Sequence, residues 1–225
     1  MNTFREFAYD LTRPVNGQYP LPWTTLSADP EHARVFLAGM NQATAYPTSE
    51  CSQDEFVETL FDPGAFRRLY LKIRPDGAPD PTQENTDAFV RRLLDRGVDC
   101  VIETNVVCYS TPRSEDLNHP EHSEGRKRGE EIFRMLITRI RPAVLIVHGA
   151  APARALGRAL GTGLPAPPST GSANLALARI KREQFGQIEV IVLPSLSPPE
   201  YNKWINWSDD YLKRVAEHVA RLVLT

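Results

Sequence analysis

Apolar residues fall into four short continuous runs, separated by longer amphipathic stretches. Short uninterrupted apolar runs are typical of strands buried on both faces of a sheet. In the amphipathic stretches, apolar residues recur at helical spacing. The predicted strands are Val35–Ala38, Cys100–Val107, Ala143–Val147 and Ile188–Leu193. The predicted helices are Asp54–Phe61, Gly64–Lys72, Glu84–Gly97, Ser123–Ile140, Ala151–Leu160 and Asp209–Leu224.

Alternating strands and helices indicate a parallel sheet with helices on both faces. We therefore expect an α/β fold, a three-layer α/β/α sandwich whose central, mainly parallel sheet has about four strands. Residues 1–30 mix aromatic residues with four prolines, which favours an irregular N-terminal arm. Asp76–Pro81 is predicted to be a loop, and Ala173–Phe185 fits no single element. A length of 225 residues is consistent with a single domain over 1–225.

The composition is that of an ordinary globular protein, with 41% hydrophobic and 24% charged residues. No apolar run approaches the roughly 20 residues that a membrane helix needs. The first residues lack a basic region followed by an apolar one, so we expect no secretion signal, a cytoplasmic location and no membrane contact. The three cysteines are too few for a four-thiolate zinc or iron–sulfur site, and none are closely paired.

The formal net charge of −2 provides no general attraction for nucleic acid. Binding of phosphates would therefore depend on a local basic patch. The candidates are Arg126-Lys127-Arg128, Arg154 with Arg158, Arg179 with Lys181-Arg182, and Lys203. Each group is equally consistent with an ordinary solvated face.

Neutral polar residues follow three of the four predicted strands. The strand-end segments are Gly39-Met40-Asn41, Glu103-Thr104-Asn105 and Leu193-Pro194-Ser195-Leu196-Ser197. Since the carboxyl ends of parallel strands share one edge of the sheet, we expect these segments to converge on a crevice. The chain has no nucleophile elbow, zinc-protease motif, phosphate loop or dinucleotide fingerprint. The sequence therefore indicates a site that works through amide hydrogen bonds and positioning.

The strand-end segments, in this order, resemble the motifs of the uracil-DNA glycosylase superfamily. Gly39-Met40-Asn41 is similar to the first motif of the mismatch-specific and single-strand-selective branches. Thr104–Val107 resembles the strand end that carries the base-reading asparagine, and Ala143–Gly157 resembles the third strand with its following helix. Pro194-Ser195 resembles the core of the motif in the DNA-intercalating loop. The resemblance extends roughly from Val35 to Trp204, through short motifs whose order and spacing carry it.

This resemblance implies a monomeric, monofunctional DNA glycosylase that removes uracil or a related deaminated base from DNA. Such cleavage passes through an oxocarbenium-like sugar and a departing base anion, so it needs a placed water and hydrogen bonds to the base. By resemblance, Asn41 positions the water, and Asn105 pairs with O4 and N3–H of a flipped uracil. The implied reaction uses neither a metal nor a cofactor, and no covalent intermediate is expected because no lysine lies in the motifs.

The same resemblance suggests roles for neighbouring residues. Ser195 is a further catalytic candidate, and Gly39, Met40 and Gln42 are base-pocket candidates. Tyr46 is the first candidate for the ring that stacks on the base, with Phe56 and Phe61 as alternatives. His148 is a base-pocket candidate because it ends the third predicted strand at the same edge. The DNA-contacting candidates are Pro194, Ser197 and Lys203, with Leu196 as the wedge that fills the vacated stack. Each has a structural alternative. Asn41 is also consistent with a turn residue, Asn105 and His148 with strand-end caps, and Tyr46 with a core aromatic.

Three positions depart from the family pattern. Gln42 stands where proline is usual, Ala43 where glycine is usual, and Leu193 where a histidine or asparagine stabilises charge on O2 of the leaving base. Leucine donates no hydrogen bond, and losing one such donor costs on the order of 100-fold in rate. Either Ser195, Ser197 or a backbone N–H substitutes, or the enzyme is slow or differently specialised, or its activity is lost.

Two other functions therefore stay open. One is a catalytically impaired glycosylase-fold protein that binds nucleic acid or a free base without cleavage. The other is a nucleoside or nucleotide hydrolase acting on small molecules, which the slightly acidic balance suggests.

Overall fold

A computed structural model describes residues 3–26, 29–74 and 80–224. Its sheet has six strands in the order β1-β3-β2-β4-β6-β5. The strands are β1 (Thr24–Thr25), β2 (Val35–Gly39), β3 (Val101–Asn105), β4 (Val144–His148), β5 (Ala176–Arg182) and β6 (Gly186–Leu193). The four central strands run parallel, and the edge strands β1 and β5 are antiparallel to their neighbours. The predicted α/β fold and all four predicted strands are confirmed, and the sheet gains one strand at each edge.

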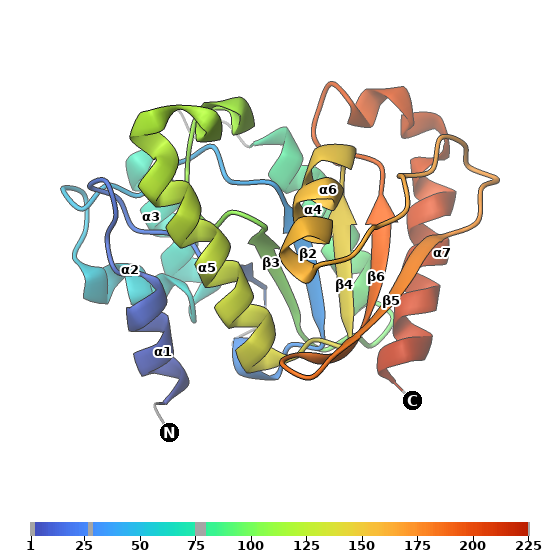
Figure 1. The fold of residues 1–225 in the computed structure, drawn as a ribbon, viewed down its shortest axis with the longest axis horizontal. Helices are drawn as coiled ribbons and strands as arrows, with labels where there is room; N and C mark the ends of the chain where they lie inside the picture. The colour runs from blue at the N-terminus through green and yellow to red at the C-terminus, as the bar shows by residue number, and fades with distance from the viewer. Residues whose placement is uncertain (1–2, 27–28, 75–79, 225) are drawn as a thin grey trace.

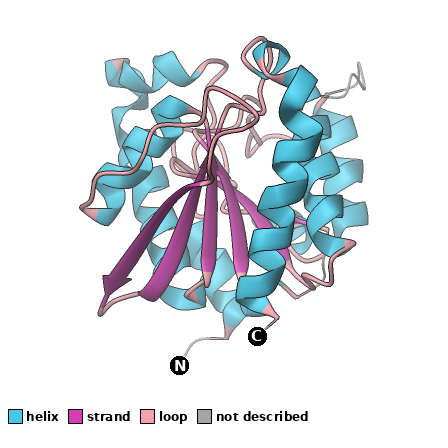
Figure 2. Ribbon diagram, turned by 90° about the vertical axis from the view of Figure 1, so that its right-hand side faces the viewer, coloured by secondary structure: helices cyan, strands magenta, loops and turns pink. Residues whose placement is uncertain are grey.

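Seven α-helices accompany the sheet in the described part of the chain. They are α1 (Phe4–Leu11), α2 (Gln53–Thr59), α3 (Pro63–Ile73), α4 (Pro81–Leu94), α5 (Ser123–Ile140), α6 (Ala150–Leu160) and α7 (Ile205–Val223). Figures 1 and 2 show the fanned sheet between helices on both sides. The six predicted helices are confirmed; Ser123–Ile140 has its predicted ends, and the ends of the other five are shifted. Most of the loop predicted over Asp76–Pro81 lies outside the described residues.

Each face of the sheet carries its own core. One core lies between the sheet and α1, α2, α5 and α6, and includes Phe36, Ile102 and Val147. The other lies between the sheet and the pair α4 and α7, and includes Leu37, Val101 and Ile146. Because alternate residues of each strand enter different cores, the strands are apolar throughout, as the sequence pattern requires.

The prediction of an irregular N-terminal arm is wrong over residues 4–11, which form α1. Its start is fixed by a capping box, in which Thr3 Oγ1 accepts from Glu6 N at 3.2 Å and Thr3 N donates to Glu6 Oε2 at 2.6 Å. Phe4 is buried and its ring stacks on Trp23, with centroids 5.4 Å apart. The prolines that suggested an irregular arm come only after this helix.

Residues 173–185 were ambiguous because they contain the edge strand β5. This strand pairs with β6 alone and alternates between exposed and partly buried positions, so it lacks a continuous apolar run. Leu177, for example, is 40% exposed.

The carboxyl edge of the sheet contains a topological switch point, where the connections on the two sides of β2 run in opposite directions. Strands β3 and β4 lie on opposite sides of β2, so the connections diverge there, and ligands of open α/β sheets bind at such points. The segments after β2 and β3 continue the pairing beyond the strands, since Val106 N donates to Gly39 O at 3.0 Å and Val107 N to Met40 O at 2.9 Å. These backbone bonds hold the first two predicted motifs together.

Candidate functional site

Four residues end the four parallel strands side by side. They are Asn105 of β3, Gly39 of β2, His148 of β4 and Leu193 of β6, and we call them the edge row. Gly39 is in register with Asn105, and His148 with Leu193. Residues two positions earlier in β2, β4 and β6 belong to the core under α4 and α7. The alternation of strands therefore directs the edge row toward that same face.

Gly39 has no side chain, and two polar side chains from the neighbouring strands lie close to the place where its Cβ would be. A Cβ at this position would lie 2.8 Å from Asn105 Oδ1 and 3.2 Å from His148 Nε2. Asn105 therefore reaches over the glycine from β3, and His148 reaches over it from β4. The approach of Asn105 and His148 to Gly39 adds β4 to the strands that supply polar groups at this edge.

Asn105 is held by Gln42, the residue that stands where the resembling family has proline. Asn105 Nδ2 donates to Gln42 Oε1 at 3.1 Å. Asn105 Oδ1 is the atom that lies over Gly39. Gln42 Nε2 is buried and has no hydrogen-bond partner. The pair therefore leaves Asn105 Oδ1 over Gly39, whereas Gln42 Nε2 is enclosed by the protein without a hydrogen-bond partner.

His148 is buried at 7% exposure, and its imidazole is neutral at neutral pH because burial lowers its pKa to about 4. The backbone N–H of Leu196 donates to His148 Nδ1 at 3.3 Å. Since Nδ1 is an acceptor, the single proton of the neutral ring is assigned to Nε2. His148 therefore offers an N–H donor above Gly39, on the strand next to Leu193.

Asn41 clamps the first motif to the loop that follows β3. Its Nδ2 donates to Thr111 Oγ1 at 2.9 Å, and its Oδ1 accepts from Ser114 Oγ at 2.7 Å. Asn41 Nδ2 also lies 3.2 Å from Gln42 O, so Asn41 and Asn105 share Gln42 as a partner. One lone pair of Asn41 Oδ1 remains for a further donor, such as a water. Thr111 and Ser114 were not identified from the sequence.

The segment after β6 is fixed from two sides. Ser195 Oγ accepts from Ser197 N at 3.1 Å, which closes a tight turn. Trp204 Nε1 donates to Ser195 O at 2.7 Å, and Asn85 of α4 donates through Nδ2 to Leu196 O at 2.8 Å. Trp204 therefore packs on this turn.

Two predictions about this site are wrong, for the same reason. Leu196 is fully buried with the α4 and α7 core, so it is not an exposed wedge; Pro194 beside it is buried as well. Tyr46 is 2% exposed and packs near Phe56 and Phe66, with ring centroids 5.2 and 6.0 Å away, so it is not free to stack on a base. In both cases the side chain is buried in the protein core, and a sequence pattern that indicates a loop does not reveal this burial.

Other predicted residues take less specific positions. Met40 is half-buried and packs on a small cluster that includes Val107. Ser195 lies beside Gly149, the residue after His148, since a Cβ on that glycine would be 3.7 Å from Ser195 Cβ. Ser197 is half-buried. Lys203 is exposed and pairs with Glu200 at 2.5 Å.

Sequence reasoning missed Glu103 as a buried acid near the site. It lies two residues before Asn105 in β3, on the same face, and accepts from Gln83 Nε2 of α4 at 3.0 Å. Burial, together with the nearby charge of Asp87, raises the pKa of Glu103 to about 7. The available signal was a single carboxylate directly after the apolar residues Val101 and Ile102 of this strand.

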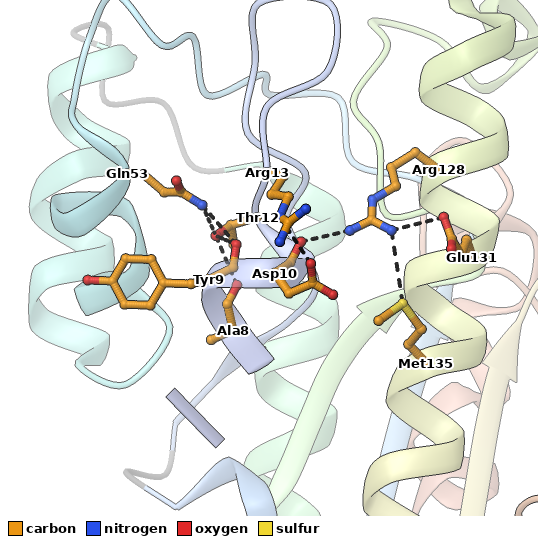
Figure 3. A network of polar contacts seen from close by, with 9 residues as sticks. All are labelled: Ala8, Tyr9, Asp10, Thr12, Arg13, Gln53, Arg128, Glu131 and Met135. Carbon is orange, nitrogen blue, oxygen red and sulfur yellow. Dashed lines mark hydrogen bonds and ion pairs between the residues drawn. The ribbon is translucent and has the colours of Figure 1, made fainter. Parts of the chain in front are cut away.

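The basic residues at the start of α5 are largely engaged within the protein. Figure 3 shows Arg128 connecting α5 to the end of α1: Nη2 donates to Asp10 O at 2.7 Å, and Nη1 pairs with Glu131 at 2.9 Å. Arg126 pairs with Glu130 at 3.2 Å. Lys127 between them is exposed. The predicted patch is therefore less available to phosphates than its sequence suggests.

Two surface hollows lie away from the edge row. One, of about 790 Å³, is lined by α5 residues with Phe7 and Arg141, and the other, of about 360 Å³, lies between α2 and α3. In the part of the chain that the structure describes, no group of three or more His, Cys, Asp or Glu residues is placed to hold a metal. No helix within the described ranges is both long enough and apolar enough to span a membrane. Comparison with protein-family models and with curated proteins finds no match to this chain.

Proposed function

We propose that this protein is a monofunctional DNA glycosylase that hydrolyses the N-glycosidic bond of uracil or a related deaminated base. The observation that carries the proposal is that Asn105 Oδ1 and His148 Nε2 both lie over Gly39, at 2.8 and 3.2 Å from the place of its missing Cβ. Both groups are neutral and come from the two strands flanking β2, at the edge where open α/β sheets bind ligands. An acceptor beside a donor suits the polar edge of a base.

The reaction needs a donor for the leaving group. The bond between C1′ and the base nitrogen breaks with its electron pair going to the base, and negative charge collects on O2. His148 Nε2–H donates to this oxygen, while Asn105 Oδ1 accepts from N3–H. A fixed neutral donor stabilises the developing anion without reorganisation. In this proposal His148 supplies, from the neighbouring strand, the hydrogen bond that Leu193 cannot donate.

Water completes the hydrolysis by forming a bond to C1′ and releasing its proton to solvent. Asn41 Oδ1 orients this water through its remaining lone pair. The bonds from Asn41 to Thr111 and Ser114 fix the amide before substrate binds, which is the arrangement that positioning catalysis requires. Glu103 is buried below the edge row and takes no part in this step.

DNA would be held by exposed groups near the turn after β6. Lys203 pairs with Glu200 on the surface, and such pairs contribute little to stability, so a phosphate can replace the carboxylate. Binding through such contacts weakens with salt. A small-molecule hydrolase would lack this dependence.

The second candidate is a protein that binds nucleic acid or a free base without cleavage. The burial of Tyr46 and Leu196 favours it, because neither the predicted stacking ring nor the predicted wedge is available. For the third candidate, a small-molecule hydrolase, we name no observation of comparable weight.

Cleavage of uracil-containing DNA tests the proposal. Single- and double-stranded oligonucleotides with one uracil are incubated with the protein, and abasic sites are revealed by alkaline strand scission. We expect cleavage by the unsubstituted protein, a loss on the order of 100-fold for His148→Met, and partial recovery for His148→Gln, which keeps an N–H donor. His119→Met, in an exposed loop, is the matched control. Binding without cleavage would favour the second candidate, and absence of both would overturn the proposal.

A further inference from the structure

The larger of the two surface hollows lies between α1 and the outer face of α5. Its volume is about 790 Å³, and we call it the α1–α5 hollow. Its apolar lining comes from Phe7 of α1 and Met135 of α5, which are both half-buried against the core on this face of the sheet. Arg128 holds the two helices together beside Met135, since its Nη2 donates to Asp10 O at 2.7 Å (Figure 3). The hollow is therefore built between helices that are tied to each other.

The α1–α5 hollow is remote from the edge row. Helix α5 ends at Ile140, and β4 begins four residues later at Val144. The lining continues to Arg141, directly after the end of α5, so the hollow lies toward the amino ends of the strands (Figure 1). The edge row lies at their carboxyl ends. A molecule bound in the hollow would therefore leave the edge row uncovered.

Positive charge surrounds the apolar lining. The charged residues that line the hollow are Glu131, Arg134, Arg139 and Arg141. Three arginines and one glutamate give this lining a charge of +2, although the formal net charge of the whole chain is −2. The hollow therefore concentrates charge of the sign opposite to that of the protein.

Two of these arginines have no acidic partner within the described part of the chain. Glu131 pairs with Arg128 at 2.9 Å, and Arg139 pairs with Glu31 at 3.1 Å. Arg134 and Arg141 are exposed, and neither forms an ion pair with any residue that the structure describes. Their guanidinium groups are therefore available to carboxylates from outside the chain.

We propose that the α1–α5 hollow binds an acidic segment of a partner protein that carries one large apolar side chain. Carboxylates of the segment pair with Arg134 and Arg141, because a guanidinium group matches a carboxylate with two parallel hydrogen bonds. The apolar side chain packs on Phe7 and Met135, and a methionine adapts its shape to different apolar groups. A segment with one charged and one apolar face is the kind of ligand that a groove between helices accepts. The inference does not depend on the proposed function.

The same features separate this partner from other anions. The backbone of duplex DNA offers phosphates to the arginines but no apolar group to Phe7 and Met135. A second copy of this chain, in a twofold contact, would place the hollow against itself and bring like charges together. A single phosphate or carboxylate ion would leave most of the volume of about 790 Å³ open.

Binding of a designed peptide tests the charges of the hollow. The probe is a fluorescein-labelled peptide with glutamates on both sides of one tryptophan, and its binding to the full chain is followed by fluorescence anisotropy. We expect saturable binding that weakens with salt, because exposed charges are screened. Arg134→Glu and Arg141→Glu should each lower the affinity about threefold or more, since each replaces an attraction by a repulsion. Together they should lower it about tenfold or more, because effects at separate sites usually add.

Arg91→Glu is the matched control for these variants. Arg91 is an exposed arginine of α4, which packs on the other face of the sheet, and its substitution changes the net charge by the same amount. We expect it to leave the affinity for the peptide unchanged. Urea unfolding of each variant checks that the exposed substitutions leave the protein folded.

A change in the peptide tests the apolar lining without altering the protein. Alanine in place of the tryptophan should lower the affinity about tenfold or more, since burying a large apolar side chain contributes about 1.5–3 kcal/mol. Arg134→Glu should weaken the binding of both peptides. Equal affinities for the two peptides would overturn the apolar part of the proposal.

The remaining outcomes identify or exclude the partner. A loss of affinity in Arg134→Glu and Arg141→Glu, but not in Arg91→Glu, supports the proposal. Absence of saturable peptide binding at low salt, or binding that neither hollow variant weakens, overturns it. Displacement of the peptide by a DNA duplex whose own binding is lost in Arg134→Glu would assign the hollow to nucleic acid and overturn it as well. Uracil excision by Arg134→Glu should stay unchanged, so this test and that of the proposed function fail independently.

Discussion

Gly39→Ala tests whether the space between Asn105 and His148 is functional. The added methyl carbon would lie 2.8 Å from Asn105 Oδ1 and 3.2 Å from His148 Nε2. Since van der Waals contacts are normally about 3.5–4.0 Å, Asn105 has to retreat by about 0.7–1.2 Å, and the methyl group occupies the place of a ligand edge. The substitution should therefore disrupt the proposed base site directly.

The expected loss of activity is much larger than the expected loss of stability. Overpacking costs about 1–3 kcal/mol, and alanine returns about 0.4–1 kcal/mol by restricting the unfolded chain, so the variant should fold. A displacement of about 1 Å in a catalytic group costs on the order of 100-fold in rate. We expect kcat/KM for uracil excision to fall at least that far.

Single-turnover excision and urea unfolding measure the two effects on the same preparation. Gly163→Ala is the matched control, because a Cβ there meets nothing within 4 Å. Excision by folded Gly39→Ala within about threefold of the unsubstituted rate would refute the reasoning, since 100-fold is the loss expected from such a displacement.

Three further predictions concern stability, each measured by urea unfolding. Burial lowers the pKa of His148 from its ordinary value of 6.5 to about 4, so the free energy of unfolding should fall by up to about 3 kcal/mol from pH 6.5 to 4; an equal slope in His148→Met would contradict this. The pKa of Glu103 is about 7 against 4.5, so its ionisation opposes folding as pH rises between these values. Glu103→Gln should therefore stabilise the protein by up to about 3 kcal/mol at pH 8, and no gain would contradict the burial argument. Leu196→Ala should cost about 2–5 kcal/mol, whereas an exposed wedge would cost little.

The sequence predicted the fold more completely than it predicted the site. The central strands are apolar on both faces, so each appears as a continuous run, and the long helices show clear periodicity. Strand β5 was ambiguous because only one neighbour and one face constrain its residues. Helix α1 was not predicted because the four prolines that follow it favour irregular structure over the first 30 residues. Thr3 and Glu6, which form its capping box, were the available signal for the helix.

The sequence located the ends of the strands, but it did not show which contacts each side chain makes there. The periodicity of β2, β3 and β4 brings Gly39, Asn105 and His148 to one edge. Which atoms face each other depends on register and on partners far away in sequence, such as Gln42 for Asn105. Tyr46 and Leu196 were assigned from loop positions, and their burial depends on tertiary packing that no local pattern encodes.

The central claim is that one base lies across Gly39 between Asn105 and His148. The most direct measurement is a crystal structure with an oligonucleotide that carries 2′-fluoro-2′-deoxyuridine, whose electron-withdrawing fluorine slows glycosidic cleavage. The account predicts uracil O2 and N3 within about 2.7–3.2 Å of His148 Nε2 and Asn105 Oδ1, respectively. A base bound elsewhere, with these two side chains still meeting over an empty Gly39, would contradict it.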